Sequence, residues 1–498
     1  MSPTTSASEA TPLLPVDAPR PARLAPVRRL QLISYLMVAA MSMPNTSLLY
    51  VMRTMSCDAF DADHPFEGKG DRCHAPDVES LAAANTAAMS SVQTIGGILS
   101  IFVTQFWIAR LGTKTAMFQG SIWSSIRMIT HVYAMYIGGA TGVRITIAAQ
   151  LLCILGSPGG FMLATNSALM ETVPAAQRTA MFGMLGGAQM AGYGTGLVMG
   201  GTLYTYLGLY GPFLTAFVML VLVVLLGLSI IPYVPPAHKR PGPDGKPAAK
   251  PSALNALKMF RPMRDAQGRR SWTLLCLICG VFMASLATGY VPIALQLMGQ
   301  ALFGFEPNMT SAMLLGNMVM RTIFLMFIFP RLIAAGRRWL ASKLPVEPIA
   351  SETASVHSAG ESEAEEDASP LERNNAAFDI HFLRLSILVD AVLTGAVSFV
   401  RKDWQLFVAA AILPLASGTG PAAKGVVTEL VGPEHKQEAL SAIALVESMA
   451  TVSTVGLFGS AYAALAKQGM PQMVFAANAA VAFVAFNILV PVRLRPVA

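Results

Sequence analysis

The stretch PYVPPAHKRPGPDGKPAAKPSALNALKMFRPMRDAQGRR, residues 232–270, is basic and proline-rich, and it interrupts an otherwise apolar chain. Six apolar runs lie on each side of it, each close to or above the roughly 20 residues with which an α-helix crosses a bilayer. The runs are 30–50, 81–108, 115–137, 144–169, 180–204 and 212–233, then 272–297, 311–332, 382–400, 405–430, 438–465 and 472–492. The central stretch therefore divides the chain into two sets of six predicted spans.

The composition identifies lipid as the main solvent of the chain. Of its 498 residues, 54% are hydrophobic and 13% are charged, whereas a soluble domain carries about 25% charged residues. Backbone groups inside a bilayer must be hydrogen-bonded within the protein, so these runs are expected to be helices. The sequence predicts an all-α membrane protein of twelve transmembrane helices in two six-helix, pseudo-symmetric bundles.

The basic residues of the loops predict the orientation of the chain. They fall mainly in alternate loops, at 28–29, 110–114, 178, 239–270, 331–343, 436 and 493–495. Cytoplasmic loops carry the excess of Lys and Arg, so both termini are expected to be cytoplasmic. The net charge of +7 is then explained by the bilayer and does not indicate a nucleic-acid partner.

The same reasoning predicts the domain organisation. A disordered cytoplasmic N-terminus, 1–29, precedes a first bundle, 30–233, which a cytoplasmic linker, 234–271, joins to a second bundle, 272–492. A cytoplasmic tail, 493–498, follows. Within the second bundle, the acidic, Ser/Ala-rich insert 343–377 is expected to be a disordered cytoplasmic loop. It is interpreted as a passive linker or as a regulatory loop.

Two short motifs bear on location and modification. Glu9, with Leu13 and Leu14, fits an acidic dileucine sorting signal, so both the plasma membrane and a vacuole-like membrane remain open. Asn308, with Met309 and Thr310, forms a glycosylation sequon in a loop expected on the outer side.

Two of the five cysteines, Cys57 and Cys73, fall in the first long polar loop. If that loop faces outside, they are able to form a disulfide, and both the bonded and the free form remain open. Cys276 and Cys279 form a CxxC pair inside an apolar run, where packing explains them better than redox chemistry.

Charged residues inside predicted spans are the main functional candidates. A central Lys, Arg or Asp costs about 2.5–3.5 kcal/mol on insertion scales, so such a group normally faces a cavity or a partner. The candidates are Lys424, Glu447, Arg321, Arg127 and His131. Glu447 is interpreted as a proton-coupling carboxylate, with Lys424 and Arg321 attracting an anionic substrate group or holding Glu447 when the site is empty. The alternative is a fixed structural ion pair.

Uncharged polar residues in the spans complete the predicted cavity. They are Asn317, on the same helix face as Arg321, together with Asn166, Gln189 and Tyr290. Each of them is equally explained as a hydrogen-bonding contact between helices.

A faint internal repeat relates the two sets of spans. Gly160 lies eleven residues before Glu171, and Gly418 lies eleven residues before Glu429. Both pairs close an even-numbered span, as expected of duplicated halves.

The end of the second span, QFWIARLGTK (105–114), resembles the signature Gly-x-x-x-Asp-Arg-x-Gly-Arg-Lys of the major facilitator superfamily. Arg110, Gly112 and Lys114 match it, whereas Ala109 replaces its Asp. The resemblance implies a cytoplasmic gating role for the three matching residues. The missing Asp removes the partner of the usual gating contact.

Span five is similar to the antiporter motif of that superfamily, Gly-x-x-x-Gly-Pro-x-x-Gly-Gly, at Gly192, Gly196, Gly200 and Gly201, with Leu197 in place of the proline. Glycines spaced in this way also allow another helix to approach closely.

Within the superfamily, the chain resembles a fungal branch related to the proton-coupled folate transporters and to drug/proton antiporters. That resemblance implies a gating role for Asp379 and Arg384, and it places Arg321, Lys424 and Glu447 among the family's functional positions. Lys424 stands where this branch has arginine.

These features predict a secondary transporter that moves a small organic solute, anionic in one interpretation, by alternating access with proton coupling. The span-five motif favours export, and the resemblance to a folate uptake group favours import. A non-transporting substrate sensor is a further alternative. No cofactor, metal or enzymatic activity is expected, and the partners are the solute, protons and the bilayer, with the protein as a monomer.

Overall fold

The computed structural model describes residues 24–63, 73, 76–231, 233, 260, 263–264, 270–305, 307–343, 370–431 and 435–492. The dileucine motif, most of the predicted N-terminus, most of the linker, the centre of the insert and the C-terminal tail lie outside the described residues. The side chain of Asn308 is also outside them, although its backbone belongs to the first turn of a helix.

The first half of the chain is helical throughout its described part. Its elements are α1 (Leu24–Ser42), α2 (Asn45–Asp63), α3 (Pro76–Leu111), α4 (Thr113–Ile137), α5 (Gly139–Ala149), the 3₁₀ helix η2 (Gln150–Ile154), α6 (Pro158–Thr172), α7 (Ala175–Leu207) and α8 (Gly211–Ile230). We call α1–α8 the N-terminal half.

A two-stranded antiparallel hairpin, β1 (Met263–Arg264) and β2 (Arg270–Ser271), precedes the second set of helices. These are α10 (Thr273–Gly289), α11 (Val291–Phe303), α12 (Pro307–Ile323), the π-helix η4 (Phe324–Ile328), α13 (Phe329–Lys343), α14 (Pro370–Val397), α15 (Asp403–Ile412), the 3₁₀ helix η5 (Leu413–Ala416), α16 (Thr419–Leu430), α17 (Lys436–Lys467) and α18 (Met473–Leu489). We call α10–α18 the C-terminal half.

The helices match the predicted spans in order. In the described part of the chain, nine helical stretches are long and apolar enough to cross a bilayer, and α18 is apolar but shorter. Helices α4 and α7 cover predicted spans three and five. The fold is therefore an all-α membrane protein, as the apolar runs predict.

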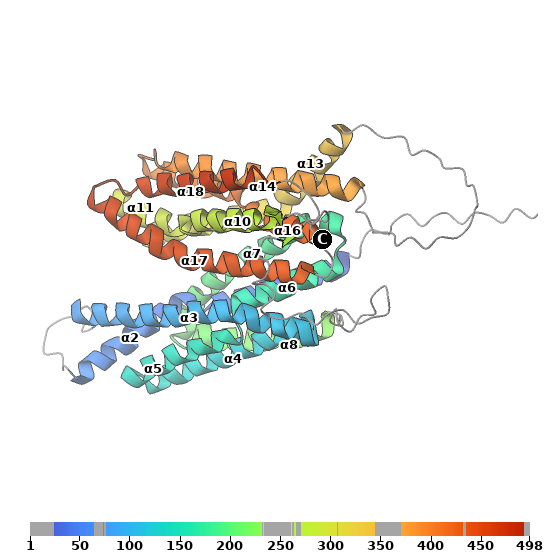
Figure 1. Cartoon of the computed structure of the whole chain (residues 1–498). Coiled ribbons are helices and arrows are strands. Elements are labelled where there is room, and N and C mark those ends of the chain that lie inside the picture. The colour runs from blue at the N-terminus through green and yellow to red at the C-terminus, as the bar shows by residue number, and fades with distance from the viewer. Residues whose placement is uncertain are drawn as a thin grey trace, which may run out of the picture.

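The two halves have separate hydrophobic cores. One buried cluster is built almost entirely from α1–α8, and the other large clusters are built from α10–α18. Figure 1 shows the two groups of long helices, with the blue-to-green N-terminal half below the yellow-to-red C-terminal half. Helix α7 packs on α12, α13 and α16, and α17 packs on α3 and α6, so these elements join the halves.

Spans four and ten break in the same way, which agrees with the repeat in the sequence. Each consists of a short helix, a 3₁₀ turn and a second helix: α5–η2–α6 and α15–η5–α16. The breaks occur at prolines, which cannot donate a backbone hydrogen bond. Pro158 opens α6, with Ser157 as its N-cap, and Pro414 lies in η5.

Three glycines of α7 allow close packing on α1. A Cβ atom at Gly192 or Gly196 would collide with backbone atoms of α1, and one at Gly200 with the backbone of Met43, the residue that follows α1. At Gly201 a Cβ would meet nothing within 4 Å. Three of the four glycines in the predicted packing motif therefore pack closely on α1 or on the residue directly after it.

Two predicted boundaries need correction. Helix α1 already begins at Leu24, inside the predicted disordered N-terminus 1–29, and α14 begins at Pro370, inside the predicted disordered insert 343–377. Both helices extend beyond their apolar run into a polar flank, which hydrophobicity alone does not detect.

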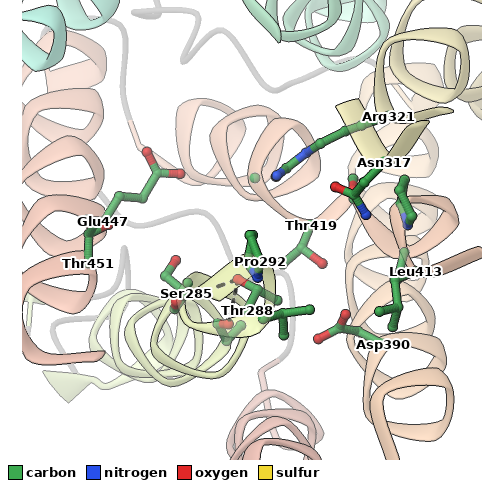
Figure 2. Close-up of a pocket in the computed structure, with 17 residues that line it drawn as sticks. Ser285, Thr288, Pro292, Asn317, Arg321, Asp390, Leu413, Thr419, Glu447 and Thr451 are labelled. Atoms are coloured by element: carbon green, nitrogen blue, oxygen red, sulfur yellow. Dashed lines mark hydrogen bonds between the residues drawn. The ribbon is translucent and has the colours of Figure 1, made fainter. Parts of the chain in front are cut away.

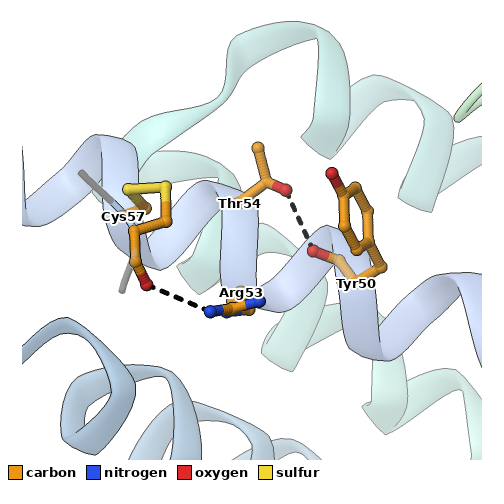
Figure 3. The surroundings of a disulfide bond; sticks show 5 residues. Tyr50, Arg53, Thr54 and Cys57 are labelled. Carbon is orange, nitrogen blue, oxygen red and sulfur yellow. Dashed lines mark hydrogen bonds between the residues drawn. A yellow bond between two sulfur atoms is a disulfide. The ribbon is translucent and has the colours of Figure 1, made fainter. Parts of the chain in front are cut away.

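The first outer region also differs from its predicted form. Cys57 belongs to α2 and not to a polar loop, because α2 continues past the apolar run and buries Met52 and Met55. A disulfide joins Cys57 to Cys73, with Cα atoms 5.3 Å apart. Arg53 donates a hydrogen bond to the carbonyl oxygen of Cys73, as Figure 3 shows beside the disulfide.

Candidate functional site

A pocket of about 300 Å³ lies within the C-terminal half. Its walls come from α10, α11, α12, α14, η5, α16 and α17. The break between α10 and α11, at Pro292, and the break at η5 both border it, so irregular backbone lies beside a polar space. This combination of broken helices and a cavity is typical of carrier binding sites.

Glu447 of α17 and Lys424 of α16 form an ion pair beside this pocket. Their Oε2 and Nζ atoms are 3.2 Å apart, and the side chains are 28% and 13% exposed. Glu447 also lines the pocket, next to Gly420, which lies one turn before Lys424. The structure therefore brings together two of the charged residues that the sequence singled out.

Arg321 enters the same pocket from the opposite wall. Figure 2 shows Arg321, from α12, and Glu447, from α17, pointing toward one another across the pocket. The Nε atom of Arg321 is buried and has no hydrogen-bond partner, and no ion pair within 4.0 Å involves this side chain among the described residues. Arg321 is thus a cation with unused donors that faces a polar space.

Asp390 and Asn317 also line the pocket, on the same side as Arg321. Asp390 of α14 lines the pocket and attracts Arg321 electrostatically, but the two do not form a close ion pair in the described part of the chain. Asn317, one turn before Arg321, donates a hydrogen bond of 2.7 Å to the carbonyl oxygen of Ala410. Its amide therefore fixes α12 against α15, while its side chain still borders the pocket.

The pocket lies near the middle of the spans. Glu447 is eleven residues from the start of α17, which corresponds to about 16 Å along a helix. That depth is about half of a hydrocarbon core of roughly 30 Å. A polar pocket at this depth, with two cations and two carboxylates around it, is suited to binding a small charged solute away from water.

Arg127 and His131 lie elsewhere, in a buried cluster of the N-terminal half. Arg127 of α4 donates hydrogen bonds to Gln150 and Cys153 of η2, and His131 lies 3.3 Å from the amide nitrogen of Gln150. The side chains of Arg127 and His131 are both at least 95% buried. They lie outside the C-terminal pocket and fix α4 against the break in span four.

The remaining polar candidates also lie outside the lining of the pocket. Gln189 of α7 donates a hydrogen bond of 3.4 Å to Thr165, and Asn166 is buried in α6. Tyr290, at the junction of α10 and α11, is buried and stacks on Phe458. Its chain neighbours Gly289 and Val291 line the pocket.

Four residues of the predicted gating motifs make their described contacts within their own half. Arg110 lies over the ring of Phe106, and Lys114 donates a hydrogen bond of 2.7 Å to Leu228. Gly112, between α3 and α4, has a φ of 91°, which favours glycine. Arg384 donates hydrogen bonds to three carbonyl groups at the end of α18.

Asp379 does connect the two halves. This buried carboxylate accepts hydrogen bonds from Arg337 of α13 and from Thr179 of α7. Arg337 also donates to the carbonyl oxygen of Ala176, at the start of α7, and lies 4.0 Å from Glu429 of α16.

A second set of contacts connects α3 and α6 with α17. Ser441 donates a hydrogen bond of 2.6 Å to Gln105, and Gln437 donates one of 2.7 Å to Ser167. We call the end of the molecule with these contacts and the Asp379 contacts the closed end. It comprises the C-terminal parts of α3, α6, α13 and α16 and the N-terminal parts of α7, α14 and α17.

Sequence reasoning did not identify Thr179, Arg337, Gln437 and Ser441 as functional candidates. Three of them are small or uncharged, and Arg337 was one of several basic residues in a predicted cytoplasmic loop. The available signal was Gln105, a departure from the family signature that forms one of these contacts. Among the described residues, no group of three His, Cys, Asp or Glu side chains is arranged to hold a metal ion.

The fold and its central pocket define a class of protein, the multi-span solute transporter. The family model of the Major Facilitator Superfamily matches residues 31–344, so the chain belongs to that family. Members of the family are membrane transporters and not enzymes, and this chain is accordingly an integral membrane transporter. A search of the curated proteins finds no match.

Solved structures share the fold at low sequence identity. The human organic anion transporter MFSD10 (TETRAN) is 14% identical, with a TM-score of 0.65 over 93% of this chain and 99% of that one. A bacterial homologue of the iron transporter ferroportin, in an outward-facing state, is 14% identical, with a TM-score of 0.60 over 93% and 98%. The E. coli fucose:proton symporter FucP is 12% identical, with a TM-score of 0.61 over 94% and 99%.

Proposed function

We propose that this chain is a proton-coupled secondary transporter that exports a small organic anion, such as a metabolite or a drug. The observation that carries the proposal is the pocket in which the Lys424–Glu447 ion pair faces Arg321, a cation with no ion-pair partner within 4.0 Å in the described part of the chain. A free guanidinium suits a carboxylate, sulfonate or phosphate group, because its planar donors match their oxygens.

Glu447 serves as the proton carrier in this proposal. The pocket and the adjoining pair hold two cations, Arg321 and Lys424, and two carboxylates, Asp390 and Glu447. The carboxylate of Glu447 can take up and lose a proton among these charges. In exchange, Glu447 carries the proton on the inward half of the cycle, and the anion occupies the site on the outward half.

The contacts at the closed end support alternating access. The basic residues Arg110, Lys114, Arg337 and Arg338 cluster at this end, which the positive-inside rule assigns to the cytoplasm. On this assignment, the contacts support a state closed toward the cytoplasm. Breaking the Thr179–Asp379 and Gln105–Ser441 contacts and separating the two halves would expose the pocket to the cytoplasmic side.

The solute class has support from outside the pocket geometry. One protein with this fold, MFSD10, is an organic anion transporter, and another, FucP, is a fucose:proton symporter. At 14% and 12% identity these relatives share the fold alone with this chain, so the pocket charges carry the argument for an anion. The glycine motif of α7 is the reason for proposing export over import.

The test is a transport screen in oriented vesicles that contain the purified protein. Organic anions and neutral solutes of matched size are offered with an acidic exterior, with an acidic interior and without a pH gradient. Export by proton exchange predicts that an acidic exterior accelerates the exit of anions. Acceleration of anion entry by the same gradient would identify an importer and overturn the proposed direction.

The same vesicles distinguish the remaining alternative. A substrate sensor built on this fold binds its solute without counterflow of labelled against unlabelled solute. Counterflow of any anion therefore excludes a pure sensor. Absence of flux for every solute, with binding retained, would overturn the transport proposal.

A further inference from the structure

A second hollow, of about 640 Å³, lies on the outside of the C-terminal half, between α13 and α14, with Phe324 of η4 and Leu415 of η5 at its inner end. Its lining is apolar apart from His381 and Ser386, and Ser386 is hydrogen-bonded to the carbonyl oxygen of Ala416. The side chains of Leu332 and Leu385 on its walls are 45% and 56% exposed. Because these spans lie in a bilayer, the open side of this groove faces lipid.

The groove has the depth of one leaflet. Along α14 it extends from Phe378 to Val389, about 16 Å of helix. A hydrocarbon core is roughly 30 Å thick, so one leaflet contributes about half of that. One lipid acyl chain that enters from the membrane surface therefore matches the groove in depth and in polarity.

The end of the groove that is nearer the closed end of the molecule lies at the membrane surface. Trp339 lines this end, and the apolar stretches of α13 and α14 end and begin there, at Leu340 and Ala377. Tryptophan is enriched at the headgroup level of membranes. His381 of α14 lines the same end and is exposed, with no hydrogen-bond partner in the described part of the chain.

A basic side chain stands beside this end. Arg338, the chain neighbour of Trp339, is exposed and forms no ion pair within 4.0 Å among the residues that the structure describes. Arg337, by contrast, is committed to Asp379. Among the described residues, the free charge near the opening is therefore that of Arg338, which complements an anionic headgroup.

We propose that this groove is a binding site for an anionic glycerophospholipid of the leaflet at the closed end. One acyl chain fills the space between α13 and α14. The phosphate group lies at the membrane surface, between Arg338 and His381. This site is separate from the solute pocket and does not depend on the transported solute or on proton coupling.

The groove also borders the contact between the halves. Phe382 lines the groove and packs edge-on against Phe329, with ring centroids 5.4 Å apart. Phe329 in turn fills the space beside Gly183 of α7. The side chains that would contact the acyl chain are thus one layer away from the N-terminal half.

The test uses Trp339 as the reporter in the full-length protein. The other four tryptophans, Trp107, Trp123, Trp272 and Trp404, are replaced by Phe. The protein is then placed in phosphatidylcholine vesicles that contain a small fraction of either phosphatidylglycerol or phosphatidylcholine with brominated chains. Bromine quenches tryptophan at short range. We expect the brominated phosphatidylglycerol to quench Trp339 about fivefold more effectively, the effect of one basic residue at an anionic surface.

Matched variants assign the effect to the groove. Ala335 lines the groove and its neighbour Ala334 does not, although both are exposed on α13. Ala335→Phe should abolish the extra quenching, and Ala334→Phe should retain it. Arg338→Gln should remove the preference for phosphatidylglycerol, whereas Arg401→Gln, an equal change of charge in the turn between α14 and α15, should not.

Equal quenching by the two brominated lipids would overturn the proposal, and so would equal effects of the two alanine variants. If the variant with one tryptophan does not fold, native mass spectrometry of the unaltered chain and of Ala335→Phe provides the same decision. Retention of phosphatidylglycerol adducts by the unaltered chain alone supports the site. Equal retention by both contradicts it.

Discussion

Thr179 of α7 donates a hydrogen bond to Asp379 of α14, although 200 residues separate the two in the chain. Asp379 is fully buried, and Arg337 is its only ion-pair partner within 4.0 Å among the described residues. A buried carboxylate is stable only when its oxygens are hydrogen-bonded or paired. The N-terminal half therefore supplies part of what Asp379 needs, and separation of the halves removes it.

Thr179→Val should favour opening of the closed end. The change keeps the shape of the side chain and removes its hydrogen bond to a charged acceptor, which is worth about 1.5–3 kcal/mol. The ratio of open to closed molecules should rise about tenfold or more. The measurement is the distance distribution between spin labels at the exposed positions Gln177 and Arg338, on the two sides of the contact.

Thr195→Val, on the same helix, is the matched control. The hydroxyl of Thr195 is hydrogen-bonded only to carbonyl groups of its own helix within the described residues. This variant should keep the native distance distribution. If both variants shift it equally, the Thr179–Asp379 contact does not hold the closed end.

Glu447→Gln should remove the dependence of flux on pH. Glutamine keeps the size of the side chain but cannot exchange a proton, so an acidic exterior should no longer accelerate the exit of the solute. Counterflow, which needs no net proton movement, should remain. Flux and counterflow are measured in the same vesicles. A pH response equal to that of the unaltered protein would exclude Glu447 as the proton carrier.

Lys424→Ala should weaken the transport of anions much more than that of neutral solutes. The substitution removes one of two cations at the site and leaves Glu447 without its partner at 3.2 Å. A hydrogen bond between charged groups contributes about 1.5–3 kcal/mol, so loss of this cation should lower the apparent anion affinity at least tenfold. Lys467→Ala, at the far end of α17, is the control with an equal loss of charge.

The solute dependence of the two variants decides the interpretation. Equal losses for anionic and neutral solutes in Lys424→Ala would indicate a purely structural ion pair. Preserved anion selectivity would instead assign recognition to Arg321 alone.

The sequence predicted the fold well because long apolar runs and loop charges are local signals. The repeat at Gly160 and Gly418 predicted related halves, and the matching breaks of spans four and ten agree with it. The pairing of Lys424 with Glu447 followed from the cost of burying charge, which forces such residues to find partners. The free-energy cost of burying a charged side chain can therefore be inferred from the sequence, one residue at a time.

Other features depend on three-dimensional arrangement that spacing does not encode. Arg127 and His131 carry the same signal as Arg321, yet they satisfy it with Gln150 and Cys153 inside one half. The contact of Gln105 with Ser441 joins positions 336 residues apart through neutral side chains. Hydroxyl and amide groups cost little to place anywhere, so their partners are visible only in the structure.

Cys73→Ser should lower the stability of the outer region. The disulfide closes a loop of 16 residues between Cys57 and Cys73, and a loop of that length is worth about 3 kcal/mol in the chain-entropy account. The melting temperature of the purified protein should fall, and a reducing agent should lower it for the unaltered protein but not for the variant. Equal melting temperatures in all cases would show that the bond contributes no stability.

Gly200→Ala and Gly201→Ala should change stability in opposite directions. Alanine in place of glycine stabilises a helix interior by up to about 1 kcal/mol. At Gly201 the added Cβ meets nothing within 4 Å, so this gain should appear in full. At Gly200 the Cβ would collide with the carbonyl group of Met43, a backbone atom that cannot move aside. Overpacking of this kind costs about 1–3 kcal/mol.

The two glycines are adjacent in α7, so the comparison isolates the contact with α1 from the intrinsic preference of the helix. Gly200→Ala should therefore melt several degrees below the unaltered protein in detergent, and Gly201→Ala at or above it. Disruption of the α1–α7 contact should also destabilise the rest of the N-terminal half, because α1 packs on α6, α7 and α8. If both variants were stabilised, α1 would have to lie farther from α7, and the glycines would serve helix flexibility and not close packing.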